Sequence, residues 1–542
     1  MTVSDHDAAD SLPAGTPDGQ ARVAALAAAR HADRQPAGIV SYRSAGRLLV
    51  VGSAAAIQEI KTALDSRAGI SCTGLVTDVA ESLPAVTGYL GDFEVTATDG
   101  EPQVYDLVLD LSSPPLLQAE VLPPGYFAPD GNPVALQAAL EELPGLTGEF
   151  EKPQYFRYDP VICAHGRSGM TACTRCIESC PTDAITSLGD TIEVNASLCQ
   201  GAGSCATACP TGAISYGYPR LSDTLLHLRL LLQAYRDAGG TDAVLLFHDT
   251  SAGREVVRLH AAQLPERVIP LEVEELGSVG MDVWLAGLAY GAAAVVLLAT
   301  PSLPASVMRE LSLQTDVAGQ ILAGMGYPAA ALQVCQAGSG ELPDLTGTLP
   351  GTAGRTPAGF AALDEKRTVI RLAVDHLQAQ APAPRPLVTL PAGAPFGEVL
   401  LDESRCTLCM ACVSQCPARA LAAGDDSPRL VFIEANCVQC GLCCRTCPED
   451  AIAVSPRYLY DSQQRSKRRA LCEAEPFLCI SCGKPFATRQ VIQKITSQMK
   501  GHAMFQGTAL SRLKMCEDCR VRALFASEGL GGDKPVSPGD VS

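Results

Sequence analysis

The sequence is short of positive charge. Its 542 residues include 41 lysines and arginines against 59 aspartates and glutamates, which gives a formal net charge of −18. A surface with this balance repels polyanions, so it excludes nonspecific nucleic-acid binding and favours protein partners with basic docking patches. The basic run from Arg465 to Arg469 is short, and we interpret it as a solvated face or a local docking spot.

The sequence also lacks the motifs of the common catalytic sites. It shows no acid/base pair, nucleophile elbow, P-loop or flavin fingerprint. The turn at Gly52 resembles the start of a nucleotide-binding fold, but the run from Gly52 to Ile57 lacks the further glycines that admit a pyrophosphate. These absences favour a carrier or a non-catalytic subunit over an enzyme.

No targeting signal or membrane span is expected. Residues Met1 to Asp18 carry neither the basic n-region nor the apolar h-region of a secretory signal. The stretch from Val283 to Met308 has no charged side chain and is long enough to span a bilayer. However, Pro301 and Pro304 interrupt it, and Ala292 to Ala299 favours a strand, so we interpret it as a helix packed on a sheet and then a buried strand. We expect a cytoplasmic protein.

Cysteine, by contrast, is abundant, with 23 residues. Four of them begin the signature Cys-Pro-x-x-Ala-(Ile/Leu), which is typical of the end of a run that binds an iron-sulfur cluster. The chain is too large to need a disulfide framework, and the spacings between cysteines are those of metal ligands. The four signature residues are Cys180, Cys209, Cys416 and Cys447.

The C-terminal pair of runs matches the spacing C-x2-C-x2-C-x3-C-P twice from end to end. In paired runs of this kind the fourth cysteine binds the cluster of the other run, and soft thiolates suit the iron of such clusters. Two complete motifs argue against the alternative of two zinc sites. The predicted ligands are Cys406, Cys409, Cys412 and Cys447 for one [4Fe-4S] cluster, and Cys437, Cys440, Cys443 and Cys416 for another.

The N-terminal pair of runs is a degenerate copy, which indicates internal duplication. Nine residues separate its first two cysteines, after which the spacing is regular. A third [4Fe-4S] cluster is predicted on Cys163, Cys173, Cys176 and Cys209. His165 is a further candidate, either as a ligand or as a hydrogen-bond partner of a sulfur.

The partner site of this third cluster lacks one thiolate. Its predicted ligands are Cys180, Cys199 and Cys205, and Ala202 stands where the remaining cysteine belongs. Three outcomes stay open for this site: a [3Fe-4S] cluster, a [4Fe-4S] cluster with solvent or another ligand at the fourth iron, or the loss of the cluster.

A third group of cysteines lies near the C-terminus. Two C-x2-C knuckles separated by a spacer predict a four-cysteine site, and no Cys-Pro closure follows them. We favour structural zinc over a further cluster or a metal-free module. The predicted ligands are Cys479, Cys482, Cys516 and Cys519, with Cys472 as a spare thiol or alternative ligand; Cys72, Cys335 and Cys444 have no partner by spacing.

Between the two pairs of runs, strands and helices alternate. Strands are expected at 243–247, 267–271, 292–299 and 331–334, and helices at 221–238, 254–262 and 307–325. Such alternation predicts a doubly wound parallel sheet with helices on both faces. The loop His248 to Gly253 follows a strand, so it is the place to look for a ligand, with a capped helix start as the alternative.

The expected fold class is α/β and multidomain. It combines two ferredoxin-like dicluster modules, a central doubly wound parallel-sheet domain, a small N-terminal α/β domain and a C-terminal four-cysteine metal module. The expected boundaries are 1–40 for a disordered or partly helical N-terminus, 41–150 for the small α/β domain, 151–220 for the first dicluster module, 221–340 for the central domain, 341–396 for a linker with a helix, 397–458 for the second dicluster module, 459–525 for the zinc-ribbon-like module and 526–542 for a disordered tail.

Residues 163 to 215 and 406 to 452 resemble bacterial two-cluster ferredoxins. The middle segment resembles, more weakly, the delta iron-sulfur subunit of methyl-viologen-reducing hydrogenases, although the cysteines expected there are missing. With GYF at 125 to 127, EKPQYF at 151 to 156, CAHGRSG and CGKPFA, the whole chain is similar to multi-cluster, polyferredoxin-like iron-sulfur proteins found with bacterial formate dehydrogenases. That resemblance implies electron transfer coupled to a molybdenum or tungsten oxidoreductase.

Three functions are compatible with these patterns. The first is a relay that carries single electrons between a redox enzyme, such as formate dehydrogenase, and an acceptor. The second is a subunit of an oxidoreductase complex with a ligand site in the central domain. The third is a maturation or assembly factor for a redox enzyme. The implied cofactors are three [4Fe-4S] clusters, one [3Fe-4S] or incompletely ligated [4Fe-4S] cluster, and a structural zinc ion.

Overall fold

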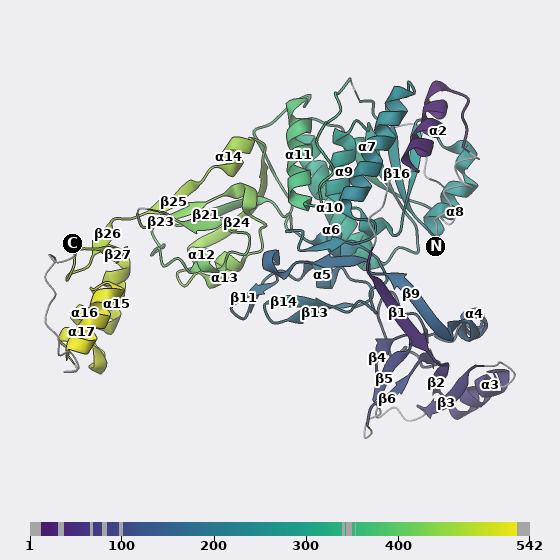
Figure 1. Cartoon of the computed structure of the whole chain (residues 1–542), viewed down its shortest axis with the longest axis horizontal. Helices are drawn as coiled ribbons and strands as arrows, with labels where there is room; N and C mark the ends of the chain where they lie inside the picture. Colours follow the sequence, from purple (N-terminus) through teal and green to yellow (C-terminus); the bar gives the residue numbers. More distant parts are fainter. Residues whose placement is uncertain are drawn as a thin grey trace, which may run out of the picture. The chain divides into compact units, whose positions relative to one another are not determined.

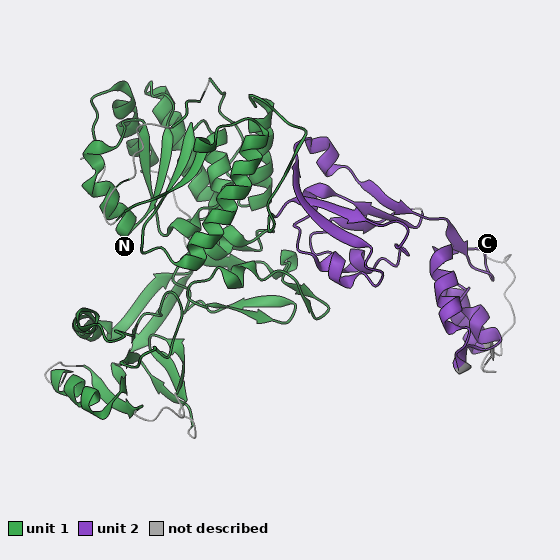
Figure 2. Cartoon of the chain, turned by 180° about the vertical axis from the view of Figure 1, so that it is seen from behind, with its two compact units in different colours: residues 1–394 green, residues 395–542 purple. Residues whose placement is uncertain are grey.

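The structure, a computed structural model, describes residues 12–30, 37–64, 69–77, 84–96, 101–338, 342, 349–352, 354–425 and 427–527. The chain divides into two compact units, Met1–Ala394 and Pro395–Ser542 (Figure 2). Most of the predicted tail at 526–542, and parts of the predicted N-terminus and linker, lie outside the described residues.

The N-terminal segment contains a helix, α2 (Pro17–Ala29). It begins where sequence rules place a helix start: Thr16 is the N-cap, its Oγ1 accepts a hydrogen bond from the Gly19 N–H, and Pro17 occupies the first turn. Arg22 of α2 is buried and donates to the carbonyl oxygens of Pro265 and Val268, at 3.2 and 3.0 Å. Contacts of α2 with a helix of the central domain make it part of unit 1.

The small α/β domain forms around β2 (Arg47–Gly52). Its order is β3-β2-β7-β8, all parallel, with α3 (Ala54–Leu64) packed on it. The other elements of this region are β1 (Ile39–Ser44) paired with β9 (Gly148–Pro153), the antiparallel sheet β4 (Ala85–Tyr89), β5 (Asp92–Thr96) and β6 (Gln103–Tyr105), and α4 (Pro133–Glu142); the remaining strands of the parallel sheet are β3 (Ser71–Val76), β7 (Leu107–Asp110) and β8 (Tyr126–Phe127).

The first cysteine-rich region is built from short hairpins and two short helices. Its strands pair antiparallel, and its helices carry cysteines or precede them directly. The elements are β10 (Phe156–Tyr158) with β15 (Ile214–Tyr216), β11 (Gly166–Arg167) with β12 (Met170–Thr171), β13 (Ile185–Leu188) with β14 (Thr191–Val194), α5 (Arg175–Glu178) and α6 (Ser204–Ala208).

The central domain contains the parallel sheet that the alternation predicts, in the order β17-β16-β18-β19. Its strands are β16 (Val244–Asp249), β17 (Val268–Val273), β18 (Ala294–Ala299) and β19 (Leu332–Gln336). The helices are α7 (Leu221–Asp237), α8 (Ala252–Leu259), α9 (Met281–Ala289), α10 (Ala305–Gly324) and, from the predicted linker, α11 (Lys366–Ala379) (Figure 1).

Both faces of this sheet are covered. On one face, Val256 and Val257 of α8 join a buried cluster with alternate residues of three strands. On the other face, Gly287 of α9 lies so close to the sheet that an added Cβ would meet Leu245 Cδ1 at 2.9 Å. The uncharged stretch that resembles a span is therefore α9, a turn and the fully buried strand β18. No helix among the described residues is long and apolar enough to cross a bilayer.

Unit 2 holds the second cysteine-rich region and the C-terminal knuckles. Strand β25 pairs with β23, so this sheet extends beyond residue 458. In unit 2, β21 (Gly397–Leu401) pairs with β24 (Ile452–Leu459), and β22 (Leu421–Ala423), β23 (Arg429–Phe432) and β25 (Arg469–Glu473) form another sheet. The helices α12 (Ala411–Gln415), α13 (Leu442–Thr446) and α14 (Ser462–Ser466) accompany these sheets, and β26 (Pro476–Leu478), β27 (Pro485–Thr488), α15 (Arg489–Met499), α16 (Thr508–Arg512) and α17 (Glu517–Ser527) follow or complete the unit. Strand β20 (Leu387–Thr389) belongs to unit 1.

Candidate metal centres

The four Cys-Pro signatures share one backbone conformation. In each, the third residue after the cysteine has a positive φ, which turns the chain back toward the sulfur. These residues are Asp183 (51°), Gly212 (80°), Arg419 (50°) and Asp450 (46°). In two of the signatures the next N–H donates to the cysteine sulfur: Ala420 N lies 3.2 Å from Cys416 Sγ, and Ala451 N lies 3.3 Å from Cys447 Sγ. Such N–H···S bonds stabilise a thiolate.

The x2 loops of unit 2 also repeat one conformation. Leu408 and Met410 of the first loop have φ values of 53° and 61°, and Gln439 and Gly441 of the second have 56° and 78°. A left-handed residue other than glycine costs about 1 to 3 kcal/mol and is typical of binding sites. Left-handed turns aim successive N–H groups into one concavity, which favours an anionic group there.

Each of these loops surrounds a small cavity together with one cysteine from the other run. Cys406, Cys409 and Cys412 line one cavity with Cys447. The other cavity is lined by Cys437, Cys440 and Cys443 with Cys416. The structure therefore brings together the two sets of four cysteines that the spacing predicts, including the exchange of the fourth cysteine. Cys409 is the exposed member of the first set.

In unit 1, the first predicted set is gathered in the same way. Cys176 lies in electrostatic range of Cys163, Cys173 and Cys209, and all but Cys173 pack into one hydrophobic cluster. A hairpin of β11 and β12 fills the longer interval between Cys163 and Cys173. The four cysteines of this set thus come from the loops that hold Cys163 and Cys173, from α5, which carries Cys176, and from the end of α6, where Cys209 lies.

The second set of unit 1 contains three cysteines. Cys205 is in electrostatic range of Cys199 and Cys180. The loop between Cys199 and Cys205 keeps the conformation of the unit 2 loops, because Gly201 and Gly203 have φ values of 81° and 74° at the equivalent positions. Ala202 therefore occupies the place of a ligand in a backbone that still has the cluster-loop shape.

Polar groups hold this loop from outside. The half-buried Lys152 amine donates to the carbonyl oxygens of Ser197 and Cys199, at 2.9 and 2.6 Å, and burial lowers the pKa of Lys152 to about 8. The Tyr216 hydroxyl donates to the Gly201 carbonyl oxygen at 2.9 Å, and its ring stacks on Tyr155. Sequence spacing alone offers no signal for these contacts.

His165 is not placed to bind metal. Its Nδ1 lies 2.8 Å from the Cys173 carbonyl oxygen, and its Nε2 lies 2.7 Å from Ser187 Oγ. Because both ring nitrogens are engaged, the side chain fixes the hairpin beside Cys173. Lys366, which the sequence does not single out, donates to the carbonyl oxygens of Ala206 and Thr207 at 2.8 and 2.6 Å and places a cation near Cys209.

The C-terminal knuckles form the tightest sulfur cluster. The ligand atoms of Cys479, Cys482, Cys516 and Cys519 all lie within 4.8 Å of one another. Cys482 Sγ and Cys516 Sγ are 3.6 Å apart, and Cys516 N donates to Cys479 Sγ at 3.2 Å. A tetrahedral ion with Zn–S bonds of about 2.3 Å needs sulfurs about 3.8 Å apart, so the spacing fits one zinc ion.

The remaining cysteines have separate surroundings. Cys472 of β25 is buried and hydrogen-bonds with Cys406, so it belongs beside the first set of unit 2 rather than with the knuckles. Cys444 forms a hydrogen bond with its neighbour Cys443. Cys72 and Cys335 pack in the cores of the two parallel sheets of unit 1.

Burial keeps the thiols of Cys173 and Cys412 protonated at neutral pH when no metal is bound. Burial, together with the smaller effect of neighbouring cysteines, raises the pKa of Cys173 to about 11 and that of Cys412 to about 12. A thiol must lose its proton to become a ligand, so metal binding here releases protons and is favoured by higher pH.

Two known families match the two cysteine-rich regions. The family described as "4Fe-4S dicluster domain" matches residues 148–213, and the family described as "4Fe-4S binding domain" matches residues 399–422. The chain carries ferredoxin-type 4Fe-4S domains. The first match spans the loop with Ala202, and the second spans the run from Cys406 to Cys416.

Similar stretches occur in three proteins. Hydrogenase-4 component A of Escherichia coli (strain K12) is 43% identical over 56 residues, which cover 10% of this chain and 25% of that protein. An isethionate sulfite-lyase activating enzyme of Oleidesulfovibrio alaskensis is 44% identical over 62 residues, which cover 11% of this chain and 20% of that protein. An uncharacterised ferredoxin of Methanocaldococcus jannaschii is 40% identical over 58 residues, which cover 11% of this chain and 32% of that protein. The chain spans less than a third of the length of each relative.

Proposed function

We propose that this protein is a cytoplasmic, multi-cluster electron relay between a redox enzyme and an acceptor. The observation that carries the proposal is the gathering of two complete sets of four cysteines around separate cavities in unit 2. Bound iron-sulfur clusters would supply one-electron transfer. The matches to 4Fe-4S families and to ferredoxin-type stretches support the same chemistry.

Three sets of residues are proposed to hold [4Fe-4S] clusters. They fit the group because each offers four soft thiolates, and in unit 2 the sets also have left-handed loops whose N–H groups favour an anion. The proposed ligands are Cys406, Cys409, Cys412 and Cys447; Cys437, Cys440, Cys443 and Cys416; and Cys163, Cys173, Cys176 and Cys209.

For the set with Ala202, we propose a [3Fe-4S] cluster or a [4Fe-4S] cluster with one non-thiolate ligand. The retained loop conformation argues against loss of the site, since Gly201 and Gly203 have the φ values of the complete loops. Cys180, Cys199 and Cys205 would supply the three thiolates.

At the C-terminus, we propose structural zinc on Cys479, Cys482, Cys516 and Cys519. The 3.6 Å separation of two sulfurs supports a single tetrahedral ion, because ligands of a cubane reach around a much larger group. A Cys516→Ser variant should lose about one zinc per chain and keep its iron. Loss of iron in that variant, with zinc unchanged, would show a further cluster instead.

The proposed partners are redox proteins with basic docking surfaces, because the chain carries a net charge of −18. A molybdenum or tungsten formate dehydrogenase is the specific partner that we propose. The exposed Cys409 makes the first set of unit 2 the natural contact point, because electron transfer needs a short path between donor and acceptor.

The test is anaerobic analysis of iron, sulfide and zinc, with EPR spectra of the oxidised and the dithionite-reduced protein. The relay requires about 15 or 16 iron atoms per chain, from three [4Fe-4S] clusters and the altered site. An oxidised [3Fe-4S] signal would identify the Ala202 site. Fewer than about 8 iron atoms after full reconstitution would contradict the relay and favour a zinc-bearing binding protein.

A further inference from the structure

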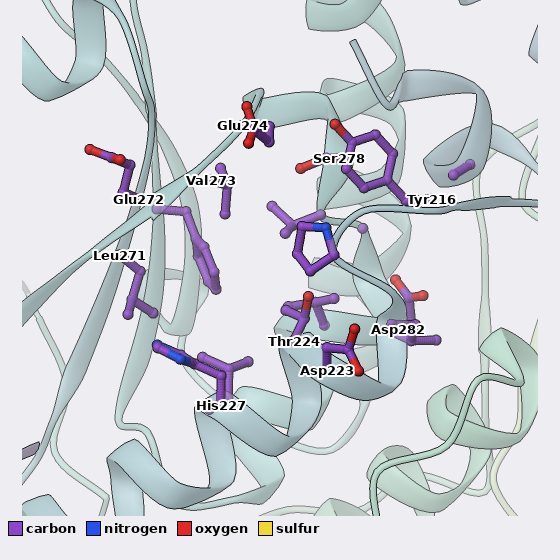
Figure 3. A pocket seen from close by; sticks show the side chains of 18 of the residues that line it. Tyr216, Asp223, Thr224, His227, Leu271, Glu272, Val273, Glu274, Ser278 and Asp282 are labelled. Atoms are coloured by element: carbon purple, nitrogen blue, oxygen red, sulfur yellow. The ribbon is translucent and has the colours of Figure 1, made fainter. Parts of the chain in front are cut away.

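A large cavity lies in unit 1 beside the sheet of the central domain. Its volume is about 270 Å³, close to the lower end of the roughly 300 to 1,000 Å³ of common ligand pockets. One wall lies at the carboxyl ends of β16 and β17 and includes Leu271 and Val273. Residues of α7 and of the start of α9 form the opposite wall (Figure 3). Its size suits one ring system rather than a dinucleotide.

One wall of the cavity belongs to the first cysteine-rich region. Ala206 and Thr207 of α6 line it, next to Cys205, and so does Tyr216, whose hydroxyl is bonded to the loop of Cys199. Figure 3 shows Tyr216 at the same end of the cavity as Ser278 and Glu274. A ligand here would contact residues that shape the Ala202 site.

The cavity has no ready site for a phosphate at its strand-end loop. Phosphates of nucleotide cofactors bind the free N–H groups at the start of the helix that follows such a strand. Here the start of α8 is already occupied, because the buried Asp249 carboxylate accepts from Ser251 N at 2.8 Å and from Gly253 N at 3.0 Å. A phosphate would displace or repel this carboxylate.

The cations that line the cavity are largely engaged. Arg254 forms a two-point ion pair with Glu272, with both distances 2.6 Å, and the Lys366 amine donates to the two carbonyl oxygens of α6. Arg258 pairs with Glu255. Arg30, which is exposed and directly follows α2, is the remaining arginine of the lining.

Three side chains of the lining present hydrogen-bond acceptors to the cavity. His248 is buried, and its Nδ1 lies 3.0 Å from the Asp249 carbonyl oxygen. Because a carbonyl oxygen can only accept a hydrogen bond, Nδ1 carries the proton, and Nε2 presents a lone pair. Among the described residues, the side chains of Asp282 and Glu274 accept no hydrogen bond, although Lys366 lies in electrostatic range of Asp282. Such a site needs a ligand that donates hydrogen bonds.

We propose that this cavity binds a planar nitrogen heterocycle that carries an amino group and no phosphate, such as an aminopyrimidine-type ring. Ring N–H and amino groups would donate to the carboxylates of Asp282 and Glu274 and to His248 Nε2. The faces of the rings would pack against apolar lining residues such as Leu271 and Val273. Carboxylates pair with such donor edges through charge-assisted hydrogen bonds. The proposal does not rest on the proposed function as an electron relay.

The test is equilibrium dialysis of the full-length, cluster-loaded protein against 2-amino-4-hydroxypteridine, with FMN as the phosphate-bearing comparison. We expect saturable binding of about one pteridine per chain below about 1 mM, and weaker binding of FMN. The variants Glu274→Gln and Asp282→Asn keep the shape of each side chain, and each should weaken pteridine binding roughly tenfold or more.

Glu275→Gln is the matched control, because Glu275 adjoins Glu274 in the chain but does not line the cavity. It should bind the pteridine as the wild type does, and circular dichroism should show all three variants folded. The proposal is overturned if no saturable binding of the pteridine occurs up to about 1 mM, if FMN binds more tightly, or if all three variants bind equally. Those results would leave the iron content, and thus the relay, untouched.

Discussion

The two cysteine-rich regions share a backbone and differ in a ligand. Both close their runs with Cys-Pro turns whose third following residue is left-handed, and the loop with Ala202 has the same pair of left-handed residues as the two complete loops. What differs is the side chain at the centre of that loop. The comparison teaches that the backbone conformation of such a loop does not depend on a cysteine at its centre, because the loop with Ala202 keeps that conformation.

The regions also differ in their surroundings. In unit 1, Thr207 Oγ1 donates to the Gly277 carbonyl oxygen at 2.8 Å, and an added Cβ at Gly203 would meet Ser278 Cα at 2.3 Å. The first region is therefore packed tightly against the central domain. In unit 2, Cys409 is exposed. We expect the environment of the first region to depend on neighbouring elements, and that of the second to depend more on solvent.

The largest expected effect comes from breaking a complete set. Cys437→Ser should remove about four of the roughly 15 iron atoms. The variant leaves only three thiolates, those of Cys440, Cys443 and Cys416, to hold a [4Fe-4S] cluster that needs four. Iron and sulfide analysis after reconstitution measures the loss. Cys335→Ser, at a cysteine in the core of the central sheet, is the control and should keep full iron. Equal iron content in the two variants would refute the ligand assignment.

Next in size is the repair of the incomplete set. Ala202→Cys should supply the fourth thiolate, abolish an oxidised [3Fe-4S] EPR signal and add about one iron atom per chain. Met410→Cys adds a thiol beside a set that is already complete, so its iron content and spectra should match the wild type. Retention of the [3Fe-4S] signal in Ala202→Cys would mean that the site differs from the complete loops in more than its side chain.

A smaller effect is expected from pH. Burial raises the pKa of Cys173 to about 11 and of Cys412 to about 12, so both thiols are protonated at neutral pH until iron displaces the proton. For each proton released, the apparent affinity for iron should fall about tenfold per unit of decreasing pH. Reconstitution in buffers at pH 6.5 and 8.5, followed by optical absorption, measures this dependence in both regions. Identical loading at the two pH values would contradict it.

The smallest expected effect concerns tuning by Lys366. Its amine lies near Cys209 and bonds to the end of α6, so Lys366→Met should lower the midpoint potential of the cluster on Cys163, Cys173, Cys176 and Cys209 by an amount on the order of tens of millivolts. Redox titration followed by EPR measures the shift. Lys500→Met, at an exposed lysine of unit 2, should leave that potential unchanged. A shift in both variants would point to a general charge effect.

Much of the architecture could be predicted from local patterns. The alternation of strands and helices predicts the central parallel sheet, and β18 lies where the uncharged stretch predicts a buried strand. The pairing of β25 with β23 has no such local signal, because the two strands lie about 40 residues apart in the chain. Sequence patterns describe neighbours along the chain well, and pairing across such distances only indirectly.

The candidate sites divide in the same way. The spacing of the cysteines by itself predicted which of them group together. Cysteines at x2 spacing lie in one loop, and in paired runs the fourth cysteine of each run binds the cluster of the other run. The tertiary structure alone decided the rest: that both nitrogens of His165 are engaged, that Cys472 lies beside Cys406, and that the cavity of the central domain adjoins the loop with Ala202. These contacts join residues distant in sequence, and only packing brings them together.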